Sequence, residues 1–566
     1  MYKIVNFLGH FIDKKNRIKL VYSILITIFL SILELFSIGL VIPIIGLITN
    51  ENFLANYKNL EVFFLFFSPL EYIKTDSYFF SINQKLISGA ISLFLIIIFI
   101  KFFVSVFLVS YNFKISKNIN YFISKTVAKK NLYQNYEEYL KKDYTNYVIT
   151  LLQEVTNVTF YVQEILRLIS ELIIISSIIF FLLIYKPFMC LIVLFVLGFS
   201  AFLYLKIIKS KNLVLGRQRR DNEDVRTNLL NQIFSGFSEI KLRNSENFFL
   251  EKYLSILNKT IIPDMKIQTY SSIPRFWFEV VAAISIVAII HFLFFLNKTN
   301  SEIIINVSIF SFVSFRLIPS VNKLTSCYQY IKYFSPSAER VLKEIKENKN
   351  LNNILINKKD ILYKKLTLSK ICYSYADKTI FKNLDLNLYD KKIYGLKGTS
   401  GSGKTTLCNL LLGLLKPSAG KIYMNDDPIL DNKVIKNYIS YVPQRIFVLN
   451  DTIKNNVAFG LSDKEIDENL VIQCLKEAEL TDLLNDRGLN YKVSLDGVNL
   501  SVGQVQRLAI ARCLYFKSKI IIFDEATSAL DYSNEQKILS LIRKLNKTVL
   551  IISHNNEILK SCDEKF

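Results

Sequence analysis

The first 335 residues alternate between long, uniformly apolar runs and long charged stretches. A run of about 20 apolar residues allows a helix to cross a membrane. Such runs predict six membrane-spanning helices, at residues 20–48, 86–109, 168–185, 188–208, 276–296 and 303–327. Because only Lys186 and Pro187 separate the third run from the fourth, these two spans are expected to form a tight hairpin.

The charged stretches 110–165 and 209–272 have helix-forming composition but are too polar to lie in lipid. They are expected to extend the spans into the cytoplasm as helices, with a turn at each tip. Gly236 is the turn candidate in one tip, FSGFSEIKL. The outer loop contains VFFLFFSPL, residues 62–70, which is too short to span a membrane. This segment suits either the membrane interface or an ordinary packed loop.

Composition and charge narrow the class of protein. Hydrophobic residues make up 51% of the chain, and the net charge is +22. A nucleic-acid partner is not expected, since neither a basic stripe nor a readout motif is present. Lysine and arginine crowd the N-terminal arm, whereas acids outnumber them in the loop 51–86. By the positive-inside rule the arm is cytoplasmic and the loop external, which predicts a multi-pass protein of the bacterial cytoplasmic membrane with both chain ends inside. A cleavable signal peptide is not evident, because the first apolar run is too long.

The last 200 residues have the pattern of a soluble α/β domain, so the predicted fold class is multidomain. An all-α transmembrane domain with long cytoplasmic extensions (1–335) precedes a polar linker (336–364) and an α/β P-loop domain (365–566). The P-loop is GTSGSGKTT, which matches the pattern GxxxxGK[ST] after a short apolar run. Backbone N–H groups of such a loop surround phosphate oxygens, Lys404 reaches the β- and γ-phosphates, and Thr405 offers a hydroxyl to Mg²⁺. The loop residues are Gly398, Thr399, Ser400, Gly401, Ser402, Gly403, Lys404, Thr405 and Thr406.

Two further strand-like runs end in residues suited to ATP hydrolysis. IIIFDEATSALD ends in two acids, of which Asp524 would hold the Mg²⁺ shell and Glu525 would polarise the attacking water. IISH ends in His554, which could sense the γ-phosphate or serve a structural purpose. The phosphate loop upstream argues against a merely solvated turn for the acid pair.

Residues 500–504, LSVGQ, resemble the LSGGQ signature of ATP-binding-cassette (ABC) proteins. The other motifs follow the order of this family, and the six-span half is similar to its exporter type. The resemblance implies ATP and Mg²⁺ as ligands and a homodimer in which the signature of one subunit closes on the ATP of the other. It also implies roles for further residues: adenine stacking for Tyr375, Mg²⁺ contact for Gln444, a D-loop ending at Asp531, γ-phosphate capping by Ser501 and Gly503, and nucleotide binding for Gln504.

The chain departs from the family pattern in two places. Val502 replaces a glycine of the signature, and its amide can still face phosphate if φ stays negative. The chain also ends at Phe566, soon after His554, so the edge of the sheet is expected to be missing.

Four cations lie within or beside the apolar spans: Lys101, Arg275, Arg316 and Lys323. Charge at membrane depth is costly and usually faces a cavity or a partner. Arg275 could instead pair with Glu279 one turn later, and Lys101 could extend its ammonium to the membrane surface. Because few acids in the spans match these cations, a cavity with surplus positive charge is the alternative, and it suits a diphosphate.

IPRFWFE and SIFSFVSFRLIPSVNK resemble the flippases of lipid-linked oligosaccharides in bacterial protein N-glycosylation. That resemblance implies that the four cations meet a polyprenyl pyrophosphate glycan and that the outer segment meets its lipid tail. Lysine stands at two positions where arginine is expected, which keeps charge but loses bidentate hydrogen bonding. The alternative is an ABC exporter of another lipid, a polysaccharide precursor, a peptide or a drug.

Two rivals come from other classes. A soluble cassette ATPase of translation or DNA repair is incompatible with six apolar spans on the same chain. A channel or receptor gated by the cassette is disfavoured by the intact Glu525 and His554.

Overall fold

The computed structural model describes residues 11–49, 58–71, 81–185, 187, 191, 194–297, 299–346, 363–375, 378–398, 401–429, 435–525 and 532–566. The chain folds as two compact units. Unit 1 comprises residues 1–134 and 142–351, and unit 2 comprises residues 135–141 and 352–566.

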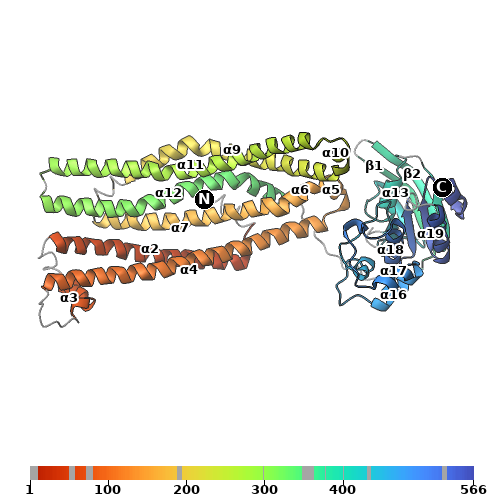
Figure 1. The fold of residues 1–566 in the computed structure, drawn as a ribbon, viewed down its shortest axis with the longest axis horizontal. Helices are drawn as coiled ribbons and strands as arrows, with labels where there is room; N and C mark the ends of the chain where they lie inside the picture. Colours follow the sequence, from red (N-terminus) through yellow and green to blue (C-terminus); the bar gives the residue numbers. More distant parts are fainter. Residues whose placement is uncertain are drawn as a thin grey trace. The chain divides into compact units, whose positions relative to one another are not determined.

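Unit 1 is all-helical, and its long helices lie side by side (Figure 1). Five helical stretches in the described residues are long and apolar enough to cross a membrane: 14–48, 82–133, 144–184, 246–295 and 302–346. The predicted fourth span, 188–208, falls partly outside the described residues. Its described part lies in η3 (Leu194–Gly198) and the start of α9. The long helices are α2 (Lys14–Thr49), α4 (Ile82–Tyr133), α7 (Val155–Tyr185), α9 (Phe199–Ser235), α11 (Glu246–Phe295) and α12 (Asn300–Lys346).

The charged stretches continue the spans as helices, as the sequence predicts. Gly236 separates α9 from the short α10 (Phe237–Leu242), and α6 (Tyr144–Ile149) passes through η2 (Thr150–Glu154) into α7. Apolar side chains fill unit 1 along two stretches, one around Phe278 and Leu317 and one around Ile119 and Val158. Helix α12 runs to Lys346, so the first part of the predicted linker is helical, and residues 347–362 lie outside the described part.

The outer segment folds as α3 (Lys58–Phe66) and η1 (Pro69–Glu71) against α4. Gly89 makes this contact possible, because a Cβ there would lie 1.8 Å from the carbonyl oxygen of Phe64. Ser68 and Ser88 share a 2.6 Å hydrogen bond. Phe66 is nevertheless 70% exposed, so the segment is both packed on one side and apolar on the other.

Unit 2 contains two sheets with helices around them (Figure 1). The four-stranded antiparallel sheet has the order β2 (Lys378–Tyr389), β1 (Lys365–Tyr375), β4 (Ala419–Met424), β5 (Asp427–Pro428). The five-stranded parallel sheet has the order β6 (Ile439–Val442), β7 (Ile520–Asp524), β8 (Thr548–Ile552), β3 (Ile393–Leu396), β9 (Glu564–Lys565). The missing sheet edge expected from the sequence is therefore wrong, since β9 pairs with β3 in that place.

The helices of unit 2 cover the apolar faces of these strands. Val549 and Ile551 of β8 face one core, and Leu550 and Ile552 face the other, as alternation along a strand requires. The helices are α13 (Lys404–Leu411), α15 (Ile453–Val457), α16 (Glu468–Glu477), α17 (Thr481–Arg487), η4 (Leu495–Gly497), α18 (Val502–Tyr515), α19 (Tyr532–Lys544) and α20 (Asn556–Lys560).

A segment from far upstream also belongs to unit 2. Helix α5 (Tyr136–Leu140) places Tyr136 against the core that contains Leu407 and Tyr373. Glu137 Oε1 accepts a 3.3 Å hydrogen bond from the backbone N–H of Lys416. The sequence did not predict that α5 belongs to unit 2, because residues 110–165 form one continuous charged stretch.

Candidate functional site

The phosphate loop follows β3 at the carboxyl end of the parallel sheet, where ligands of such sheets bind. Gly401 and Gly403 have φ of +84° and +94°, a region that favours glycine. A Cβ at Gly403 would also lie 2.6 Å from Ile380. Helix α13 begins at Lys404, with Thr405 exposed and Thr406 buried. Thr399 and Ser400 lie outside the described residues.

Lys404 joins the ends of three neighbouring segments. Its Nζ donates to the carbonyl of Gly398 at 3.0 Å and to Glu525 Oε1 at 3.0 Å, and it lies 2.6 Å from His554 Nε2. The ammonium group thus contacts the phosphate loop and the residues that follow two neighbouring strands.

Glu525 is the carboxylate at the centre of this group. Its Oε2 accepts from Gln444 Nε2 at 3.1 Å, and its Oε1 lies 3.0 Å from His554 Nε2. Glu525 has a φ of +49°, a conformation that side chains seldom adopt outside functional sites. The residues predicted from three separate motifs thus meet on one carboxylate, because β6, β7 and β8 are parallel neighbours.

Asp524 is held by a residue that the sequence motifs do not include. Tyr441 donates its hydroxyl to Asp524 Oδ2 at 2.8 Å. Burial, and next the nearby Asp524 carboxylate, raise the pKa of Tyr441 far above its usual value, so the hydroxyl stays a donor. The only sequence signal for this role is the position of Tyr441 on β6, the strand beside β7.

The signature segment forms the start of α18. Ser501 caps the helix: its Oγ accepts from the N–H of Gln504 at 3.2 Å, and the Gln504 side chain accepts from the N–H of Ser501 at 2.8 Å. The hydroxyl proton of Ser501 remains available for donation. Val502 is helical and 55% exposed, so the negative φ expected of it is present. Gly503 is buried beside it, and a Cβ there would make only ordinary contact with Arg507.

The structure describes one of the two remaining residues that are predicted to bind the nucleotide. Tyr375 lies at the end of β1 with its ring 40% exposed, edge-on to Tyr373 at 5.0 Å. An exposed ring of this kind can stack on a base. Asp531 lies outside the described residues.

The four cations of the membrane helices each contact a carboxylate. Lys101 Nζ lies 2.6 Å from Glu34 Oε2, and Arg316 Nε contacts the other oxygen of the same group. Lys323 pairs with Glu171 at 3.2 Å, and Arg275 pairs with Glu279 at 3.1 Å. Among the described residues the four cations share three carboxylates, so the surplus of positive charge expected from the sequence is reduced to one net charge.

Residues 381–528 match the family model described as ABC transporter. Unit 2 contains an ABC ATP-binding domain. The matched residues include Lys404, Gln444 and Glu525 and the capped signature helix, whereas His554 lies beyond them. Over the whole chain, the fold is similar to that of a bacterial Atm1-family ABC exporter solved with ATP bound, with a TM-score of 0.75, 16% identity, and 97% of this chain and 93% of that chain covered.

Two curated relatives match this chain over different lengths. A lactococcin-G-processing and transport ATP-binding protein of Lactococcus lactis is 42% identical over 234 residues, which is 38% of this chain and 33% of that protein. An ATP-dependent lipid A-core flippase of Cupriavidus pinatubonensis is 27% identical over 363 residues, which is 62% of this chain and 61% of that protein. The matched region thus spans from a third to under two thirds of the length of these relatives.

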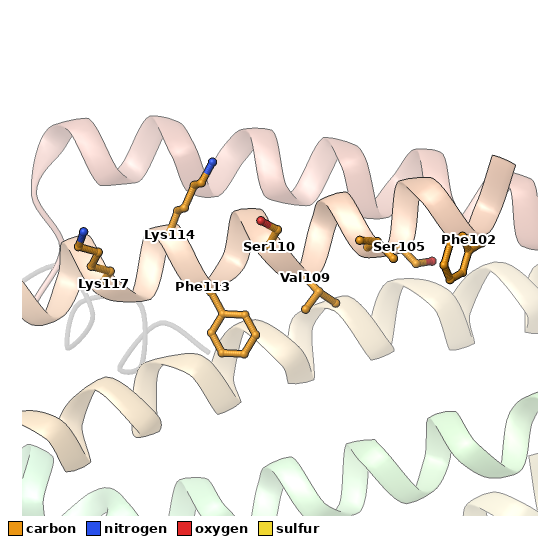
Figure 2. Close-up of a pocket in the computed structure, with 8 residues that line it drawn as sticks. Phe102, Ser105, Val109, Ser110, Phe113, Lys114 and Lys117 are labelled. Atoms are coloured by element: carbon orange, nitrogen blue, oxygen red, sulfur yellow. The ribbon is translucent and has the colours of Figure 1, made fainter. Parts of the chain in front are cut away.

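A hollow of about 830 Å³ lies outside the ABC domain, along α4. Figure 2 shows that its labelled side chains, from Phe102 to Lys117, all come from this helix. Phe113 and Val109 make it apolar, and Lys114 and Lys117 form its basic end. None of the four cations predicted for substrate lines it, so this hollow and the ion pairs are separate features of unit 1.

Proposed function

We propose that this chain forms a homodimer that hydrolyses ATP to move a lipid-linked glycan with a phosphorylated head group from the inner to the outer leaflet of a bacterial cytoplasmic membrane. The convergence of Lys404, Gln444, Glu525 and His554 carries the ATPase part of this proposal. The charged cluster inside apolar helices supports the anionic cargo.

The hydrogen bonds around Lys404 suggest how hydrolysis begins. Phosphate oxygens of ATP would take the ammonium group from Glu525, since a phosphate carries more charge than one carboxylate. Glu525 can then polarise water in line with the γ-phosphate, while Gln444 and His554 remain in contact with it. The signature of the second subunit would close this site, with the free proton of Ser501 donated to the γ-phosphate.

Mg²⁺ fits the oxygen donors at this sheet end. Asp524 uses Oδ2 for Tyr441, which leaves Oδ1, and Gln444 uses its nitrogen for Glu525, which leaves its oxygen. Thr405 adds an exposed hydroxyl. Mg²⁺ usually relies on few protein ligands, water and substrate phosphates. The ion would neutralise charge on the β- and γ-phosphates.

One relative supports a lipid cargo. The alignment with the lipid A-core flippase, at 363 residues, is longer than the ABC domain and so reaches the membrane helices. By its name that relative flips lipid A-core. For this chain, Lys101, Arg275, Arg316 and Lys323 are proposed to meet a diphosphate head, and the apolar side of α3 is proposed to meet the lipid tail.

The test is ATPase activity of the purified protein in lipid nanodiscs, with and without an undecaprenyl-diphosphate oligosaccharide. We expect the glycolipid to stimulate the wild type and not Arg316→Ala, whereas Arg243→Ala, in an exposed turn, should behave as wild type. Stimulation by a neutral drug or a peptide instead would overturn the cargo and leave the ATPase assignment intact. Absence of ATP hydrolysis under all conditions would overturn both.

A further inference from the structure

Glu34 is a buried carboxylate in the middle of a membrane helix, and the proposed cargo site assigns it no function. Its side chain is 2% exposed, whereas Lys101 and Arg316 are 25% and 26% exposed. The two cations come from α4 and α12, and Glu34 comes from α2. Both cations are therefore more accessible to a ligand than the carboxylate that pairs with them.

One carboxylate serves both cations. Each of its oxygens contacts one of them, Oε2 the ammonium of Lys101 and Oε1 the Nε of Arg316. A buried charge is stable only when it is paired, and Glu34 has two cationic partners, although its Oε2 makes no hydrogen bond among the described residues. The cluster keeps one net positive charge. An incoming anion must compete with Glu34 for the same two donors.

We propose that Glu34 is the counter-ion of Lys101 and Arg316 when no cargo is bound. It thereby sets how much negative charge a ligand needs in order to bind there. The proposal rests on the proposed function and adds a specificity-determining residue to it. A phosphate or diphosphate carries more charge and more oxygens than one carboxylate, so it outcompetes Glu34. A neutral or singly charged lipid head does not.

Glu34→Gln is the decisive variant because it keeps the shape of the side chain and removes its charge. The cluster would change from one net positive charge to two. We expect the variant to bind undecaprenyl diphosphate about tenfold more tightly than wild type, since close charge pairs at desolvated sites commonly couple by at least that factor. Binding of undecaprenol, which has no phosphate, should not change.

Equilibrium binding of these two lipids to the full-length protein in nanodiscs measures both effects. Glu164→Gln is the matched control, because Glu164 pairs with Arg167 in α7 and removal of its charge leaves the cluster intact. Adding Arg316→Gln to Glu34→Gln should abolish the gain. If Glu34→Gln does not fold, Lys101→Met gives a second test: it leaves Glu34 paired with Arg316 and no net charge, so diphosphate binding should fall to the level of undecaprenol.

The outcomes separate the two proposals. Wild-type binding of the diphosphate reports on the cargo, and the ratio of Glu34→Gln to wild type reports on Glu34. A ratio of one or less, with wild-type binding intact, would overturn the role of Glu34 alone and would mark it as a structural support for the two cations. Binding of the diphosphate no tighter than undecaprenol in every variant would overturn both proposals.

Discussion

Glu525 has two proposed duties, since it pairs with Lys404 at 3.0 Å and would later polarise water. Glu525→Gln keeps the shape of the side chain and one acceptor oxygen but removes the base. We expect ATP hydrolysis to fall ~10²-fold or more, because a positioned general base contributes that much, while ATP binding persists. Phosphate release and binding of a fluorescent ATP analogue measure the two effects. Glu557→Gln, in the neighbouring helix α20, is the control, and unchanged turnover in Glu525→Gln would show that another group acts on the water.

Tyr441 is the residue whose role depends on a single hydrogen bond. Tyr441→Phe removes the hydroxyl that holds Asp524 Oδ2 and leaves the ring in place. Groups that orient a metal ligand commonly affect metal affinity or activity by 10- to 100-fold. We expect the Mg²⁺ concentration for half-maximal ATPase activity to rise about tenfold. Tyr423→Phe on β4 should leave it unchanged, and an unaltered Mg²⁺ requirement in Tyr441→Phe would contradict the assigned role.

At the scale of elements, the contact between α3 and α4 depends on Gly89. Gly89→Ala would place a methyl group 1.8 Å from the carbonyl oxygen of Phe64, so the two helices must separate. Overpacking of this kind typically costs 1–3 kcal/mol. We expect faster hydrogen exchange at residues 58–66 and a lower melting temperature. Gly39→Ala on α2 is the matched control, since nothing lies within 4 Å of its Cβ position. Equal exchange in both variants would contradict the close packing of α3.

The sequence predicted elements and motifs well where the signal is local. Apolar runs located the long helices, and the motif residues Lys404, Gln444 and Glu525 meet as expected because parallel strands present their carboxyl ends together. Contacts between distant segments could not be predicted in this way. Tyr441 has no motif of its own, and the sharing of Glu34 by two cations depends on the packing of three helices. For this reason the sequence suggested a larger surplus of positive charge than the ion pairs leave.

At the scale of the whole molecule, the proposed head-to-tail homodimer implies that two inactive variants can restore ATPase activity when they form a mixed dimer. Lys404→Ala removes the phosphate lysine, and Ser501→Arg blocks the signature. A mixed dimer would contain one doubly damaged site and one intact site, because each site takes these residues from different subunits. We expect co-expressed variants, purified through two different tags, to recover up to about half of the wild-type ATPase activity. Mixed dimers as inactive as either parent would contradict the composite site.

Helix α5 has a consequence for how the protein is made. Residues 135–141 leave the ribosome more than 200 residues before the strands of unit 2 that they join. The ABC domain therefore receives part of its own surface, Tyr136 and Glu137, from chain that is synthesised earlier. A recombinant fragment that starts at the first strand would lack these side chains and would expose the apolar surface that Tyr136 covers.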